Sequence, residues 1–380
     1  MTGVGRLAGL AALAGGGWLL AALTGVDPAA DPRYRVAAVA LLAVGLFGST
    51  YGIDRADVRG HWRLVLAAVT VGVGLKAALI AGVVVAASGQ PAYALLAMAV
   101  AQIDPLSVAA LARPGRMSPR ARSILAAWAS FDDPVTTVLT AYGVVLLLPD
   151  GPAPSPAGLA GGLLGDAALA AAGWVLWRAG WWLRGRVRAG LAPGGLRRGL
   201  LRAGRVLALL LLVGLVAVGV AYGLMLGVAA LGFLVRPRFR YGDAVLARAT
   251  PVAFALATFA LGTLLAGGFD PVLGVLLGVA AFAAQVPVAL LLARGLPAAD
   301  RWHLALGQQN GITAVILALL LEPHLPGAAG AIGVAVLTVA VLHAAANHPR
   351  WWPTPDPEPP APAARPGPDG VPTRAERAPG

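Results

Sequence analysis

Long apolar runs follow one another along most of this chain, and short segments rich in arginine, proline or glycine separate them. A helix needs about 20 apolar residues to cross the hydrocarbon core of a bilayer, and most of these runs have that length. The spacing of the breaks predicts an all-α polytopic membrane protein with about twelve transmembrane helices. These spans are expected near residues 7–24, 36–53, 62–87, 92–112, 121–148, 157–178, 203–219, 220–235, 249–266, 271–293, 302–321 and 327–346.

The run from 201 to 235 is too long for a single span. As one helix it would measure about 52 Å, against about 30 Å for the hydrocarbon core. We therefore predict two spans here, joined by a tight turn between Gly219 and Gly223.

Composition agrees with this pattern, because 58% of the 380 residues are hydrophobic and only 12% are charged. Soluble proteins carry roughly 25% charged residues, so an arrangement of two or three soluble domains is excluded. The chain has no cysteine, which excludes disulfides, thiolate nucleophiles and zinc–thiolate sites. No cofactor is expected.

The formal charge of +12 would suggest nucleic acid as a partner for a soluble chain, but here the arginines follow the topology. The connections on one side of the predicted spans carry 21 arginines, and those on the other side carry two. By the positive-inside rule, both termini are then cytoplasmic in a multi-pass protein of the plasma (inner) membrane. The lipid bilayer is the expected partner, and four tryptophans that end the sixth span fit an interfacial belt: Trp174, Trp177, Trp181 and Trp182.

The chain divides into a transmembrane domain, residues 1–346, and a C-terminal segment, residues 347–380. That segment contains eleven prolines and balanced charge, which is typical of a disordered tail. The topology makes the tail cytoplasmic.

Five ionisable side chains fall in the middle of predicted spans. An ionisable residue at that depth costs at least ~2.5–3.5 kcal/mol on insertion, so each is a candidate functional residue. Structural ion pairs inside the bundle are the alternative interpretation. The five are Lys76 in the third span, Asp104 in the fourth, Asp132 and Asp133 in the fifth, and Asp166 in the sixth.

Proline directly follows two of these carboxylates, at Pro105 and Pro134. Because proline removes a backbone donor, both helices are expected to be bent or broken there. Free carbonyls beside the carboxylates would form an oxygen site for a transient Na⁺. Nearby hydroxyls could complete the site, or could bond back to their own helices: Ser107, Thr136 and Thr137.

The eleventh span contains a polar interruption flanked by Gly307 and Gly311. Interrupted helices at corresponding positions of two halves indicate a transporter site, with spans three to five matching spans ten to twelve. A helix-packing role for the two glycines is the weaker interpretation, because three consecutive amides lie between them: Gln308, Gln309 and Asn310.

Four motifs resemble those of the cation–proton antiporter superfamily, whose members include bacterial sodium/hydrogen exchanger-like proteins. Residues 46–54 look like its G-x-x-x-D junction, and residues 101–108 (AQIDPLSV) resemble its T-D-P motif. Residues 130–134 (SFDDP) resemble its N-D or D-D pair, and residues 311–313 its G-I-S stretch. The resemblance extends over residues 1–346. It implies an inverted-repeat fold in which the broken fourth and eleventh spans cross, with a dimerisation domain, a mobile core domain and a homodimeric assembly.

The resemblance also implies roles for the carboxylates. Asp133 would bind the cation and the proton, Asp132 would be its companion, and Asp104 would belong to the crossing of the broken helices. The pair of aspartates implies electrogenic exchange, as in the D-D members of the superfamily.

Three departures from the family pattern matter. The glutamate found a few residues before the pair in electroneutral members is missing, with Trp128 and Ala129 in that neighbourhood. Ile103 stands where threonine is usual, and the basic residue of the tenth or eleventh span is missing, with Gln285 in the tenth. Lys76 lies at the same depth in the third span, and we expect it to pair with a carboxylate, with Asp132 favoured. A fixed pair with Asp104 or Asp166 is the alternative.

The expected function is exchange of Na⁺, or of Li⁺ or K⁺, for protons, in which cation and proton compete for the same oxygens and so support pH homeostasis. A Na⁺-coupled symporter of organic anions with a related fold is the alternative. No enzymatic activity is expected, because the G-x-G-D signature of intramembrane aspartyl proteases is missing before Asp166.

Overall fold

The computed structural model describes most of the transmembrane region. The described residues are 3–25, 31–51, 53, 55–103, 117–148, 156–190, 194–235, 242–266, 268 and 270–347. The segment expected to be a disordered tail lies outside them, apart from Asn347.

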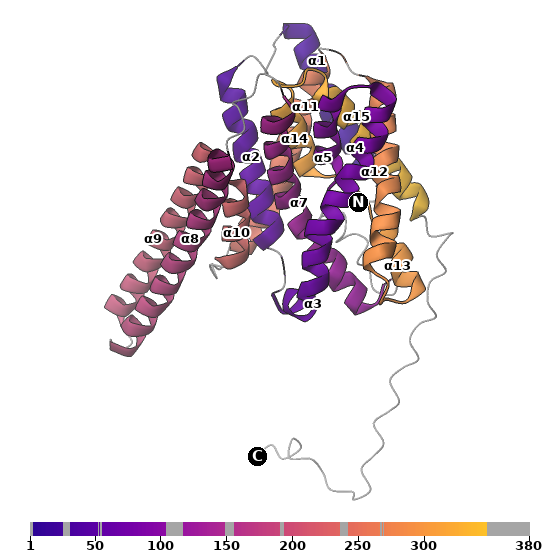
Figure 1. The fold of residues 1–380 in the computed structure, drawn as a ribbon. Helices are drawn as coiled ribbons and strands as arrows, with labels where there is room; N and C mark the ends of the chain where they lie inside the picture. The colour runs from indigo at the N-terminus through magenta and orange to yellow at the C-terminus, as the bar shows by residue number, and fades with distance from the viewer. Residues whose placement is uncertain are drawn as a thin grey trace, which may run out of the picture.

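All regular structure in these ranges is helical (Figure 1), which confirms the all-α expectation. The elements in chain order are α1 (Gly3–Thr24), α2 (Pro32–Tyr51), α3 (Arg55–Ala67), the π-helical segment η2 (Ala68–Gly72), α4 (Val73–Ser88), the short turn η3 (Pro91–Tyr93), α5 (Ala94–Val100), α7 (Pro119–Leu147), α8 (Pro156–Gly190), α9 (Gly195–Tyr222), α10 (Met225–Leu234), α11 (Gly242–Leu265), α12 (Pro271–Leu292), α13 (Ala298–Ala305), α14 (Ile312–Leu321) and α15 (Ala328–Ala346).

Five of the described helices are long and apolar enough to cross a membrane. The total of twelve spans stays a prediction, because the remaining apolar helices are shorter or adjoin residues outside the described ranges. The five are Trp62–Ser88, Ala160–Gly190, Gly195–Tyr222, Pro271–Leu292 and Ala328–Ala346.

Most helices form one bundle, while α8 and α9 make an antiparallel hairpin at its side (Figure 1). The upper part of this hairpin packs against α2 and α10, and its lower part stands apart from the bundle. Within the bundle α12 lies close against α15, because two glycines remove the side chains between them. A Cβ atom at Gly274 or Gly278 would lie 2.8 Å from the carbonyl oxygen of Ala331 or Ala335, respectively. Small residues allow such close contact between membrane helices.

The division of the run 201–235 into two helices is confirmed. Helix α9 ends at Tyr222, and α10 begins at Met225. Between them Gly223 has a φ of 69°, a left-handed conformation that glycine adopts without steric cost. The Leu224 N–H bonds to the Gly219 carbonyl over 2.8 Å and closes the turn.

Asp166 lies at this same turn. Its Oδ1 accepts a 2.7 Å hydrogen bond from the Gly227 N–H, and the Leu226 N–H is also directed at the carboxylate. The first amides of a helix have no partner within the helix, so Asp166 of α8 caps α10 from outside. The carboxylate therefore has a structural role here, in line with the alternative interpretation of the buried charges.

We expect Asp166→Ala to destabilise the protein by about 1 kcal/mol, because the substitution removes this cap. Asp166→Asn keeps an acceptor oxygen at the same place and should retain most of the stability. The apparent unfolding temperature of the detergent-solubilised protein, followed by tryptophan fluorescence, measures both variants. Unfolding temperatures equal to that of the unmodified protein in both variants would contradict the capping role.

Candidate ion-binding site

Two non-helical segments meet inside the bundle. Helix α13 ends at Ala305 and α14 begins at Ile312, so residues 306–311 interrupt the predicted eleventh span. Helix α5 ends at Val100, and Ala101 to Ile103 continue outside the helix. Asp104 and Ser107, two of the expected site residues, lie beyond this point and outside the described residues.

Amide side chains from the first of these segments bond to the main chain of the second. Asn310 Nδ2 donates to the Val100 carbonyl over 2.8 Å, and Gln308 Nε2 donates to the Gln102 carbonyl over 2.7 Å. Backbone groups that leave a helix inside a membrane need partners within the protein. The polar interruption of the sequence thus provides the hydrogen bonds that the end of α5 lacks.

The Lys76 ammonium lies beside this contact and is completely buried. Its Nζ lies 3.3 Å from Asp132 Oδ2, 3.2 Å from Gln285 Oε1 and 3.2 Å from Gln308 Oε1. These three acceptors match the three protons of the ammonium group. The expected pairing of Lys76 with Asp132 is confirmed, and Gln285 lies against the amine where the family pattern has a basic residue.

Asp132 is also completely buried, and its two oxygens differ. Oδ2 accepts from Lys76 and, over 2.9 Å, from the Ile103 N–H. Oδ1 makes no hydrogen bond of good geometry with a described residue, although the Trp128 indole N–H, one turn earlier in α7, is directed at the carboxylate. A buried oxygen of this kind is costly to leave unpaired. This oxygen therefore has capacity to take up a proton or a cation.

Asp133, the next residue of α7, is only 2% exposed and faces the α5 break. When the Gln102 amide is turned so that both of its ends have partners, its nitrogen donates to Asp133 Oδ1 over 2.6 Å. The Gln102 oxygen then accepts from the Ala314 N–H at the start of α14. Gln102 therefore connects the carboxylate pair with both interrupted helices.

The sequence predicts a bend or a break at Pro134, and the break is wrong, because α7 runs without interruption from Pro119 to Leu147 with Pro134 inside it. The Thr136 hydroxyl donates to the Asp132 and Asp133 carbonyls over 2.9 and 3.0 Å, and the Thr137 hydroxyl donates to the Asp133 carbonyl over 2.8 Å. Both threonines thus bond back to their own helix, as the alternative interpretation held.

His343 of α15 and Asn347, which directly follows this helix, bond to the non-helical segment 306–311. His343 Nδ1 lies 3.1 Å from the Gln308 carbonyl oxygen, and Asn347 Nδ2 donates to the Leu306 carbonyl over 2.9 Å. Gln309 is half-buried, and no hydrogen bond of its side chain is found within the described ranges. His343, Asn347 and Gln102 were not among the expected site residues, although His343 and Gln102 are polar residues in otherwise apolar runs of the sequence.

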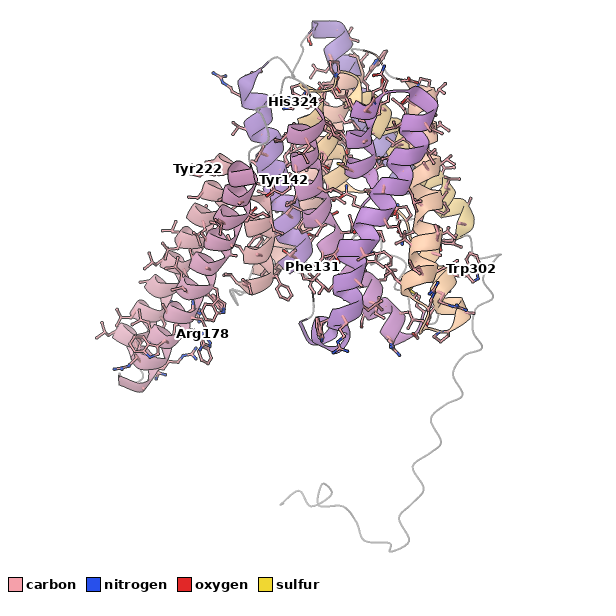
Figure 2. All side chains as sticks on the ribbon, viewed as in Figure 1. Phe131, Tyr142, Arg178, Tyr222, Trp302 and His324 are labelled. Atoms are coloured by element: carbon pink, nitrogen blue, oxygen red, sulfur yellow. The ribbon has the colours of Figure 1, made fainter. Side chains whose placement is uncertain are left out.

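An aromatic contact between α7 and α10 lies next to the carboxylate pair. Phe131, next to Asp132, makes an edge contact with Phe233 of α10 at a ring-centre distance of 5.4 Å. Phe131 is labelled in Figure 2.

Within the described residues no three His, Cys, Asp or Glu side chains lie close enough together to hold a metal ion. Asp104 is not among these residues.

A model of the family described as "Sodium/hydrogen exchanger, transmembrane" matches residues 8–346 of the chain. Among solved structures, the fold is similar to that of the sodium proton antiporter MjNhaP1 from Methanocaldococcus jannaschii at pH 8, with a TM-score of 0.58. The similarity covers 90% of this chain and 95% of that chain at 16% sequence identity. No curated protein matches the sequence significantly.

The contacts of Gln308 generate a prediction about stability. We expect Gln308→Leu to destabilise the protein by about 2 kcal/mol, because it leaves the Gln102 carbonyl and one proton of Lys76 without partners. Gln309→Leu is the matched control, since it makes the same chemical change one residue away. Apparent unfolding temperatures of the two variants in detergent provide the comparison, and equal values would contradict the central position assigned to Gln308.

Proposed function

The chain belongs to the sodium/hydrogen exchanger family, and we propose that it exchanges Na⁺, or Li⁺ or K⁺ in its place, for protons across the plasma (inner) membrane. The family is one of transporters and favours exchange over the symport of an organic anion. One observation carries the proposal. Asp132 is completely buried with one oxygen held by Lys76 and the Ile103 N–H, while its other oxygen makes no hydrogen bond of good geometry with a described residue and has only the Trp128 indole N–H directed towards it.

In this proposal the transported ions compete for the oxygens of Asp132 and Asp133. A carboxylate that holds a proton cannot offer the same oxygen as an anionic ligand to a cation, so binding of one ion expels the other. This competition links the two fluxes without covalent chemistry. Asp104 and Ser107, which follow the α5 break in sequence, are proposed to complete the oxygen ligands, with Thr136 and Thr137 in support.

Lys76 has a defined part in this exchange. When a cation replaces the ammonium group as the partner of Asp132, the amine would be left unpaired in a buried site, which is costly. Gln285 Oε1 and Gln308 Oε1, both 3.2 Å from Nζ, remain as acceptors and lower that cost. The pair can therefore open without exposing a bare charge. From a state in which the Lys76 contact is open and both carboxylates hold protons, release of two protons for one Na⁺ would make the exchange electrogenic.

We further propose that the transmembrane domain contains inverted repeats, spans three to five and ten to twelve. Lys76 of α4 and Gln285 of α12 occupy corresponding spans of these repeats, and their contact supports this pairing. Homodimeric assembly and cytoplasmic termini are proposed from the family resemblance and from the distribution of arginines, respectively.

Asp133→Asn should abolish exchange while the protein remains inserted and folded, because the amide can neither lose a proton nor bind a cation as an anion. Exchange is measured as the collapse of ΔpH in everted membrane vesicles when Na⁺, Li⁺ or K⁺ is added between pH 6 and 9. Asp166→Asn is the matched control, since it makes the same change at a carboxylate outside the site and should leave exchange intact. Full exchange by the Asp133→Asn protein would remove this residue from the mechanism.

The part of Lys76 is tested by moving the amine across the site. Lys76→Gln should change the charge transported per Na⁺, measured as current on solid-supported membranes. The double variant Lys76→Gln/Gln285→Lys brings an ammonium group back to the same place from α12, because the two side chains are 3.2 Å apart. We expect it to restore the original current. A Lys76→Gln protein that is less stable but has unchanged current and pH profile would instead make Lys76 a purely structural residue.

A further inference from the structure

The lower half of the α8–α9 hairpin carries an excess of positive charge. Residues 174–205 contain eight arginines and no aspartate or glutamate. Six of the eight are exposed, and none forms a salt bridge with a described residue. Figure 2 shows Arg178 on this part of the hairpin, which stands apart from the bundle. We call residues 174–205 the arginine tip.

The arginines of the tip lie close enough to repel one another. Arg184 of α8 interacts electrostatically with Arg188 of the same helix and with Arg205 of α9. Neighbouring positive charges raise the free energy of the folded protein unless an anion lies among them. Among the described residues no acidic side chain lies beside these arginines, so a bound anion would relieve their repulsion.

A groove of about 690 Å³ runs along one face of α8 at the tip. Its lining combines apolar and cationic side chains in alternation. The Arg178 guanidinium lies 6.0 Å from the centre of the Trp174 ring, and the Arg186 guanidinium lies 4.6 Å from that of Trp182. Stacking of this kind directs the guanidinium groups along the helix surface while their N–H donors remain free for an anion. The aromatic faces between them offer apolar surface, with Trp181 67% and Trp182 60% exposed.

The length of α8 places the groove at the level of the lipid headgroups along the membrane normal. A hydrocarbon core of about 30 Å accommodates about 20 residues of helix, so an α8 that enters at residue 156 leaves the core near Arg178. Tryptophan rings favour this boundary, and arginines just beyond it lie at the level of lipid phosphates. Guanidinium groups bind phosphate oxygens through two parallel hydrogen bonds.

We propose that the arginine tip is a binding site for anionic phospholipids, with the phosphate held by Arg178 and Arg186 and the acyl chains along the tryptophans of α8. A second copy of the chain is a poorer occupant, because it would bring a second tip with the same eight positive charges. The lipid site shares no residue with the ion-binding site, so the test of lipid binding is independent of the proposed exchange.

Lipid binding to the delipidated, detergent-purified protein tests this proposal. The apparent dissociation constant for phosphatidylglycerol is measured by native mass spectrometry for the unmodified protein and for Arg178→Gln/Arg186→Gln. Loss of two arginines should weaken binding about 30-fold, given about 1 kcal/mol for each basic residue. The matched control is Arg63→Gln/Arg294→Gln, which removes two exposed arginines from other arginine-rich connections. Arg63 also stacks on a tryptophan, Trp62, as the two arginines of the tip do on theirs. The control variant should bind as tightly as the unmodified protein.

Two further probes separate charge from lipid. Phosphatidylcholine should bind at least tenfold more weakly than phosphatidylglycerol, because it has no net charge. Inorganic phosphate should not displace phosphatidylglycerol, because it lacks acyl chains. Equal affinity of the tip variant and the control variant for phosphatidylglycerol would overturn the proposal, as would equal binding of the two lipids or displacement by phosphate.

Discussion

An ammonium group and a carboxylate without access to water must neutralise each other, and this requirement organises the centre of the molecule. Lys76 and Asp132 are both completely buried, on helices α4 and α7, and lie 3.3 Å apart. Removal of either partner would leave an unpaired charge in a medium of low dielectric constant, which typically costs 3–5 kcal/mol. The pair is therefore surrounded by amide groups that can share its charge, from α12, from the α5 end and from the α13–α14 interruption.

The same requirement explains why the end of α5 and the α13–α14 interruption lie at this point. A continuous helix uses its own backbone groups, and only a broken one can direct the Ile103 N–H at a carboxylate or leave carbonyls for neighbouring amides. Gln308 lies within the α13–α14 interruption, bonds to the main chain at the end of α5 and also contacts Lys76, so the ion pair is in direct contact with both segments. In the exchange that we propose, loss of the Lys76–Asp132 contact is thus connected to the helices that line the site.

The sequence predicted the helical class, the division of the run 201–235 and the pairing of Lys76 with Asp132. Each of these predictions depends on the length of an apolar run, on the presence of turn residues or on the position of a charged residue within a span. All three can be read directly from the sequence. The capping role of Asp166, the bonds of Gln102 and the contacts of His343 and Asn347 could not be predicted. They depend on the rotation of one helix against another across long sequence separations, which no local pattern records. The continuity of α7 at Pro134 was missed because the missing N–H costs a helix one hydrogen bond, which packing within a bundle can offset.

The account requires that a cation and protons compete for one pair of buried carboxylates, and proton release on cation binding tests this most directly. Na⁺ is added to the purified protein in weakly buffered detergent solution near neutral pH, and the protons released are measured with a pH indicator alongside the heat of binding. The account predicts release of between one and two protons for each Na⁺ bound, and no release from the Asp133→Asn protein. Binding of Na⁺ to the unmodified protein without any release of protons would contradict it.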